Sequence, residues 1–164
     1  LMAARVSDAA VALVVGVISV AFALRRLAVD RGPNRPAAVP GGRIAGAFWG
    51  AVSGFTSMIA HAGGPPFQIY MLPQRLPRDV FVGTGAVFFA ALNAVKVPPY
   101  LALGQLGAEN LATSAALFPL AIAATWAGVL LVRRVPAERL YTVIYGLLIV
   151  VGGKLVWDGA AALG

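Results

Sequence analysis

Long apolar segments with few charges between them constrain this chain more than any other feature of its sequence. They cover residues 9–24, 44–72, 80–103, 111–132 and 140–157. Charged residues make up 12 % of the 164 residues and hydrophobic residues 60 %, whereas soluble domains average about 25 % and about 45–50 %. So little charge cannot cover a soluble core. The sequence therefore predicts an all-α integral membrane protein, because a helix satisfies its own backbone hydrogen bonds in lipid.

The segment 44–72 does not fit a single straight crossing. At about 1.5 Å per residue its helix would be about 43 Å long, compared with about 30 Å for the hydrocarbon core of a bilayer. It is also broken at His61–Pro66, where two glycines and two prolines follow one another. The segment therefore either crosses once in a bent form or enters the membrane and turns back as a re-entrant hairpin.

The arginines in the loops discriminate between these two topologies. If 44–72 crosses once, the arginines divide five against six between the two sides. If it turns back, ten lie together, in the loops 25–43, 73–79 and 133–139, against Arg5 on the other side. The positive-inside rule favours the second division. We therefore predict four transmembrane helices plus a re-entrant broken-helix hairpin, with cytoplasmic basic loops and periplasmic termini.

The break at His61–Pro66 has the composition of an anion-binding turn. Half-helix N-termini at such breaks attract anions through their free N–H groups and their dipoles. Gly63 and Gly64 permit a tight turn and the close approach of a ligand, and Pro65 suits the first turn of a new helix. We predict that these three residues contact a substrate. The alternative is a kink or a surface loop with no ligand.

Two polar side chains near the break are further candidates for substrate binding. His61, the single histidine, either caps a helix end or acts on the substrate. In the second case it donates to an anion or takes up a proton in coupled transport. Gln68 follows on the short return segment and is expected to donate an amide hydrogen bond to the ligand.

Small and hydroxyl residues form two patterns upstream of the break. The glycines recur every fourth residue, a spacing that lets another helix approach closely; they are Gly42, Gly46, Gly50 and Gly54. We predict that this stripe serves packing. Ser53 and Ser57 lie one turn apart and either line a cavity or bond back to their own helix.

The segment 80–103 carries three more candidate substrate-binding residues, although Pro98-Pro99 is expected to interrupt its helix. Asn93 and Lys96 are three residues apart and therefore share a helical face. A lysine inside a membrane is costly and points to function, unless its ammonium group extends to the interface. Thr84, between two glycines, is the third candidate.

Several classes of function lack the residues they need. The chain has no cysteine, one histidine and six acidic residues. We therefore expect no catalytic residues, no metal site and no cofactor. No basic stretch is interleaved with aromatic residues, so we expect no nucleic acid partner despite the net charge of +7. Arginine outnumbers lysine eleven to two, a bias typical of GC-rich bacterial genomes.

The order and spacing of these motifs resemble the second half of the TauE/SafE family of sulfite and organosulfur-anion exporters. The resemblance rests on Gly46–Ser57, His61–Pro66, Ile69-Tyr70, Gly83–Phe89, Asn93–Lys96 and Tyr100. It implies export of sulfite, sulfoacetate or thiosulfate across the bacterial inner membrane. The family's glycine-rich break maps onto Gly63–Pro66, and its Asn–Lys region onto Asn93 and Lys96. Where the family often has Gly-x-Gly-Gly, this chain has His61-Ala62-Gly63-Gly64.

The resemblance also implies a domain organisation, because the family is built from two related halves with inverted topology. Residues 1–24 would be the last helix of a first half and 25–43 a cytoplasmic basic linker. Residues 44–164 would be the second repeat, with the hairpin at 44–72. We predict an exporter of small sulfur-containing anions, or alternatively a non-transporting subunit of a larger membrane complex. The expected partners are the anion, the bilayer, and a first half, a second copy or another membrane subunit that completes the site.

Overall fold

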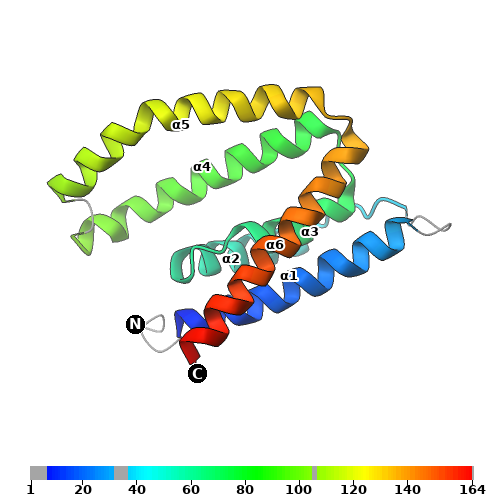
Figure 1. Ribbon diagram of the computed structural model, residues 1–164, viewed down its shortest axis with the longest axis horizontal. Helices are drawn as coiled ribbons and strands as arrows, with labels where there is room; N and C mark the ends of the chain where they lie inside the picture. Colours follow the sequence, from blue (N-terminus) through cyan, green and yellow to red (C-terminus); the bar gives the residue numbers. More distant parts are fainter. Residues whose placement is uncertain (1–6, 32–36, 105–106, 164) are drawn as a thin grey trace. The chain divides into compact units, whose positions relative to one another are not determined.

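The described part of the chain is entirely helical, as the sequence predicts (Figure 1). The computed structural model describes residues 7–31, 37–104 and 107–163. Its helices are α1 (Asp8–Arg31), α2 (Arg43–Ile59), α3 (Gly64–Met71), the 3-10 turn η2 (Leu72–Gln74), α4 (Arg78–Ala102), α5 (Ala108–Arg134) and α6 (Ala137–Leu163).

Four of these helices, α1, α4, α5 and α6, are long and apolar enough to cross a membrane. Each contains a candidate span of 23 or 25 residues, and about 20 residues suffice for the hydrocarbon core. The remaining pair, α2 and α3, has 17 and 8 residues. The prediction of four membrane-spanning helices is therefore confirmed.

Two helices extend further than the apolar runs indicate. α1 continues beyond Arg25 and Arg26 to Arg31, because arginine is a good helix former and polarity alone does not end a helix. α4 runs through Pro98 and Pro99, so the predicted interruption is wrong. The Leu103 N–H still donates to the Pro99 carbonyl over 3.0 Å, which shows that helical bonding resumes directly after the prolines.

The chain divides into two compact units. The first, Leu1–Pro77 with Tyr141–Gly164, contains α1, α2, α3 and most of α6. The second, Arg78–Leu140, contains α4 and α5. Each unit is described by itself below.

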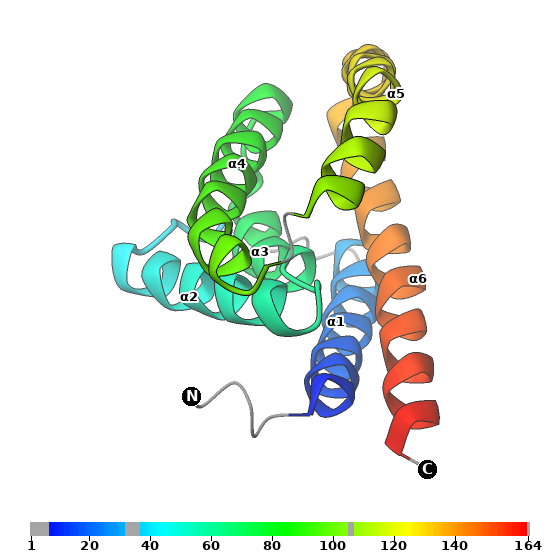
Figure 2. The same ribbon diagram turned by 90° about the vertical axis from the view of Figure 1, so that its left-hand side faces the viewer.

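Within the first unit, α1 and α6 lie side by side and antiparallel, with glycines at their closest approach (Figures 1 and 2). A Cβ atom on Gly16 of α1 would lie 2.7 Å from the Gly152 oxygen of α6. One on Gly159 would lie 2.6 Å from the Ala9 oxygen. Glycines allow such backbone contact in membranes, where close packing drives helix association. The start of α1 and the end of α6 consequently share one end of the pair.

The segment 44–72 forms a helical hairpin whose two arms pack against each other and against α1. Tyr70, near the end of α3, donates from its hydroxyl to the Gly42 carbonyl before α2, at 3.2 Å. A Cβ atom on Gly46 would lie 2.9 Å from that hydroxyl. Gly46 of the predicted stripe therefore serves packing, and the helix it admits is the hairpin's own second arm.

The loops at the open end of the hairpin show that it turns back. Arg75 forms an ion pair with Asp30 at the end of α1, with 2.5 Å between Nη2 and Oδ1. The Val39 N–H donates to the Pro73 carbonyl over 3.0 Å. The described part of loop 25–43 and residues 73–77 therefore lie at the same end of the first unit, and a single crossing of 44–72 would have separated them. This finding confirms the hairpin that the arginine count predicts.

The loop 73–79 also contacts the third basic loop. In the first unit, the Tyr141 hydroxyl donates to the Leu76 carbonyl over 2.7 Å. In the second unit, the Arg78 guanidinium donates to three carbonyl oxygens at the end of α5, those of Val132, Arg133 and Val135. A cation at a helix C-terminus stabilises the helix dipole. One of the ten arginines used to predict the topology thus also caps a helix.

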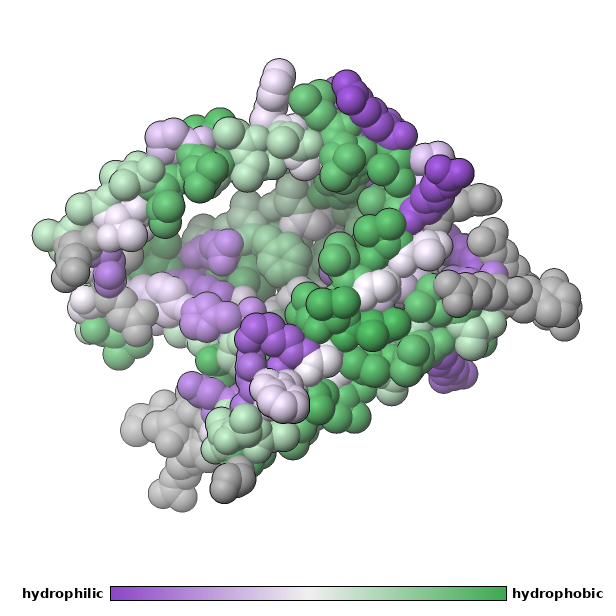
Figure 3. Space-filling view, viewed as in Figure 1, coloured by the Kyte–Doolittle hydropathy of each residue, from purple (hydrophilic) through white to green (hydrophobic). Residues whose placement is uncertain are grey.

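The surface of the long helices is apolar. Figure 3 shows apolar side chains over α1 and α6, where Val14, Val150 and Trp157 are exposed. In α5 the span Asn110–Arg134 has no buried residue in its most apolar window. Exposed apolar surface of this extent is foreign to soluble monomers. It matches helices whose surroundings are lipid or other membrane protein.

Candidate functional site

The break follows a left-handed residue that ends α2. His61 has a φ of 52°, at the position after the helix cap where glycine is usual. Histidine is among the few other residue types enriched in this conformation. The N–H groups of Ala60 and Ala62 both donate to the Thr56 carbonyl, at 3.0 and 3.2 Å. His61 is exposed at the tip of the hairpin.

Gly63 is packed tightly against α2. A Cβ atom on it would lie 2.7 Å from the Ser57 Cβ and 2.8 Å from the Ser53 carbonyl oxygen. Its φ of −75° is open to every residue. The glycine is therefore required by close approach between the arms of the hairpin, while the left-handed turn belongs to His61.

Gly64, the next residue, has open space around it. No heavy atom lies within 4 Å of a Cβ atom built there. Gly64 begins α3, and Pro65 and Pro66 follow in its first turn, as the sequence predicts for prolines at a helix start. Since proline has no N–H group, Gly63 and Gly64 supply the backbone donors at this turn.

Gln68 carries the one buried side-chain nitrogen or oxygen in the described part of the chain that lacks a hydrogen-bond partner, its Oε1. It lies four residues after Gly64 on α3, so the two share a helical face. Helical side chains lean toward the N-terminus of their helix. Gln68 therefore lies on the face of α3 that begins at the open turn of Gly64.

Two hydroxyl residues of α2 hold the break against the helix. Ser53 donates from Oγ to the Gly63 carbonyl over 2.6 Å, and Thr56 Oγ1 lies 3.0 Å from the Ala62 carbonyl oxygen. Sequence reasoning left Ser53 without a definite role and missed Thr56. The available signal was their spacing, because residues 53, 56 and 57 fall on one face of an otherwise apolar helix.

The other three candidates lie on α4 in the second unit. Thr84 and Asn93 are exposed and Lys96 is half-buried. Asn93 and Lys96 share a helical face, as their spacing predicts, and α4 continues past them to Tyr100 without interruption. Thr84 lines an open groove with its neighbours on α4, which are Asp79, Val80, Gly83, Val87 and Phe88.

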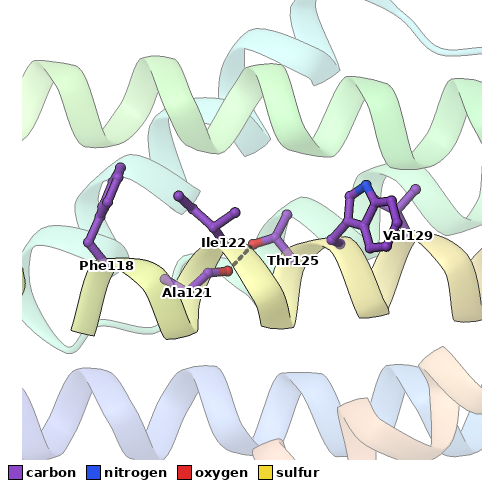
Figure 4. Close-up of a pocket in the computed structure, with 6 residues that line it drawn as sticks. Phe118, Ala121, Ile122, Thr125 and Val129 are labelled. Atoms are coloured by element: carbon purple, nitrogen blue, oxygen red, sulfur yellow. Dashed lines mark hydrogen bonds between the residues drawn. The ribbon is translucent and has the colours of Figure 1, made fainter. Parts of the chain in front are cut away.

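A second groove, on α5, has the wrong chemistry for an anion. All six of its lining residues come from one face of that helix (Figure 4). They are Phe118, Ala121, Ile122, Thr125, Trp126 and Val129. The single hydroxyl among them, on Thr125, donates to the Ala121 carbonyl of its own helix over 2.7 Å. The groove therefore offers an anion no free hydroxyl group and no charged side chain.

The described residues contain no group of three or more potential metal ligands among His, Cys, Asp and Glu. The polar groups gathered at the break are backbone N–H groups, an amide and an imidazole. Such groups bind an anion through hydrogen bonds and a helix dipole, without covalent chemistry.

Comparison with known proteins identifies the family. Neither the curated proteins nor the solved structures include a match to this chain. Residues 1–155 match the family described as sulfite exporter TauE/SafE. The match extends over the first apolar segment and linker as well as the part on which the sequence resemblance rests. This family consists of multi-pass membrane transporters that export anions, and it is not a family of enzymes. With its four apolar helices and its broken hairpin, the chain belongs to the TauE/SafE sulfite exporter family.

Proposed function

We propose that this chain takes part in the export of sulfite or a related sulfur oxyanion, such as sulfoacetate or thiosulfate, and that the anion binds at the hairpin break. The observation that carries the proposal is the buried Oε1 of Gln68, which has no hydrogen-bond partner, on the same helical face of α3 as the open turn at Gly64. The oxygen and nitrogen of an amide exchange places by a half-turn, so the NH₂ group can take the position of that oxygen. In this orientation Gln68 would donate a hydrogen bond to an oxyanion at Gly64.

The electrostatics of the break favour a negative ligand. The N-terminus of a helix carries a partial positive charge, and α3 presents its first turn at the tip of the hairpin. His61 is exposed beside this turn and adds an N–H donor. Pro65 preorganises the turn because its φ is fixed.

Residues of α4 complete the proposed set of substrate contacts. Asn93 offers an amide and Lys96 a positive charge on the same helical face, and Thr84 offers a hydroxyl nearer the start of the helix. A lysine in a spanning helix is retained at an energetic cost. We propose that Lys96 balances the charge of the anion as it passes through the membrane.

The domain organisation and orientation extend this proposal. We infer that residues 1–24 end a first repeat, that 25–43 link the repeats on the cytoplasmic side of a bacterial inner membrane, and that 44–164 form the second repeat. Both termini would then be periplasmic. The anion would bind where this repeat meets a first half, a second copy or another membrane subunit.

One observation favours the alternative of a non-transporting subunit. α5 is exposed on all sides from Leu111 to Leu131, which suits a helix that packs against other proteins in a larger complex. A subunit of that kind would keep the hairpin as a structural element. It would not require a particular charge at Lys96.

Efflux from inverted membrane vesicles or proteoliposomes distinguishes the two functions. Lys96→Ala should lower sulfite efflux by about tenfold or more, since it removes a charge-assisted contact with the anion. Lys154→Ala is the matched control, because Lys154 is an exposed lysine of another span that pairs with Asp158. His61→Gly keeps the left-handed turn and removes the imidazole, so it separates capping from a role in transport.

The outcomes are distinct. If Lys96→Ala and the wild type transport sulfite, sulfoacetate and thiosulfate equally well, Lys96 has no role in transport. If the wild-type vesicles release none of these anions faster than protein-free vesicles, the alternative function is favoured. Unchanged efflux in His61→Gly assigns His61 to capping alone.

A further inference from the structure

Two buried hydroxyl groups of α2 bind two consecutive carbonyl groups of the break. Ser53 is 0 % exposed and Thr56 is 4 % exposed. Ser53 Oγ donates to the Gly63 carbonyl over 2.6 Å. A buried hydroxyl without a hydrogen-bond partner is costly in an apolar environment. The partner of the Ser53 hydroxyl, the Gly63 carbonyl, lies outside α2.

The hydroxyl of Thr56 has one hydrogen and three carbonyl oxygens within reach. The carbonyl oxygens of Val52 and Ser53 lie 2.9 and 3.3 Å from Thr56 Oγ1. Both belong to α2, where carbonyls accept hydrogen bonds from backbone N–H groups of the helix. The Ala62 oxygen, at 3.0 Å, lies outside any helix. Ala62 therefore depends most on the hydroxyl.

These two bonds fix the direction of the next two N–H groups. All peptide bonds in the described residues are trans, and in a planar trans peptide the C=O and the following N–H point in opposite directions. With the Ala62 carbonyl turned toward α2, the Gly63 N–H points away from it. With the Gly63 carbonyl turned toward α2, the Gly64 N–H also points away.

The same two N–H groups directly precede the two prolines in the first turn of α3. Pro65 and Pro66 occupy the following positions of α3 and have no N–H. The Phe67 N–H already donates to the Gly63 carbonyl over 3.5 Å. An anion at this turn thus depends on Gly63 and Gly64 for its backbone hydrogen bonds.

We propose that Ser53 and Thr56 are positioning residues: by holding the carbonyls of Ala62 and Gly63 against α2, they aim the N–H groups of Gly63 and Gly64 at the substrate anion. They act through the backbone and do not touch the anion. The inference rests on the proposed function, because it presupposes that the anion binds at the break.

The test uses the full chain in lipid nanodiscs, labelled with ¹³C at alanine carbonyls and ¹⁵N at glycine. The sequence contains three Ala–Gly pairs, at residues 45–46, 62–63 and 127–128. Carbonyl–nitrogen correlation NMR therefore shows three peptide groups. One of them joins the Ala62 carbonyl to the Gly63 N–H, and the other two are internal controls. Sodium sulfite in oxygen-free buffer is the probe.

In the wild type, sulfite should shift the Ala62–Gly63 signal and leave the 45–46 and 127–128 signals in place. Thr56→Val, which keeps the side-chain shape and removes the hydroxyl, should shift the Ala62 carbonyl signal before sulfite is added. It should also raise the Kd for sulfite by about tenfold, the size expected for one misdirected charge-assisted hydrogen bond. Thr56→Ser retains the hydroxyl and should restore the Kd.

Ser53→Ala is the second variant and should raise the Kd in the same way. Thr125→Val is the control, because its hydroxyl also binds a backbone carbonyl but inside α5; its Kd should equal that of the wild type. If sulfite shifts no signal in the wild type, the proposed function fails, and this inference fails with it. If sulfite shifts the Gly63 signal but Thr56→Val and Ser53→Ala bind it as tightly as the wild type, the positioning role alone is overturned.

Discussion

At the residue scale, the two glycines of the break have different roles. Both were predicted to give the turn its freedom and to let a ligand approach. Instead Gly63 makes room for α2, and Gly64 faces open space. The left-handed conformation belongs to His61. One short motif thus combines a cap, a packing contact and an open turn.

Alanine substitutions separate these roles. Gly63→Ala should destabilise the protein by about 1–3 kcal/mol, because the new Cβ would meet the backbone of Ser53 and the rigid Cβ of Ser57. Gly64→Ala should keep the wild-type stability or raise it slightly, since a Cβ there has space and restricts the unfolded chain. Thermal denaturation of both variants in detergent measures the difference in Tm. Equal Tm values for the two variants would contradict the packing role of Gly63.

At the element scale, the described contacts show that backbone proximity holds α1 to α6. The glycines at this interface, Gly16, Gly152 and Gly159, place backbone atoms of one helix against the other. The glycine pattern that is regular in the sequence is instead the stripe on α2. A glycine spacing predicts that some helix approaches closely. It does not say which helix, because that depends on elements far away in the sequence.

A pair of variants on α6 tests the glycine interface. Gly159→Ala should lower the stability by about 1–3 kcal/mol, since the new Cβ would lie 2.6 Å from the Ala9 oxygen and 2.8 Å from the Leu13 nitrogen. Gly153→Ala on the same helix is the control, because no atom lies within 4 Å of its Cβ position. The measurement is the midpoint of thermal unfolding. A Gly159→Ala variant as stable as Gly153→Ala would show that α1 and α6 can separate without cost.

At the scale of the whole molecule, the return of the hairpin is what lets the positive-inside rule apply to ten arginines in three loops. In the first unit Arg75 pairs with Asp30, and in the second unit Arg78 donates to the Arg133 carbonyl at the end of α5. We expect all three basic loops to be cytoplasmic, because positively charged loops are retained there.

Cysteine labelling tests this orientation in a chain that has no cysteine of its own. Arg134→Cys lies in the basic loop 133–139 and should resist an impermeant thiol reagent added to intact spheroplasts. Ala161→Cys, exposed near the end of α6, should be labelled readily. In inverted vesicles, Arg134→Cys should be labelled readily and Ala161→Cys should resist the reagent. Ready labelling of Arg134→Cys from outside would contradict the predicted orientation.

The class of protein, the number of spanning helices and the return of the hairpin could all be predicted from the residues alone. These follow from properties counted along the chain, namely apolar length and arginine distribution. The break was located in the same way, since two glycines followed by two prolines disfavour the interior of a helix. Helix ends were less predictable: prolines 98 and 99 lie within α4.

The contacts of each residue of the break could not be predicted, because they depend on how α3 folds back onto α2. This fold packs Gly63 and leaves Gly64 open. It brings the Gly63 carbonyl to Ser53 and the Ala62 carbonyl to Thr56, and it leaves the Gln68 Oε1 without a partner. The physical reason is that a hydrogen bond or a steric contact is a property of two groups in space. A sequence pattern identifies one of the two groups, but which group it contacts depends on the tertiary structure.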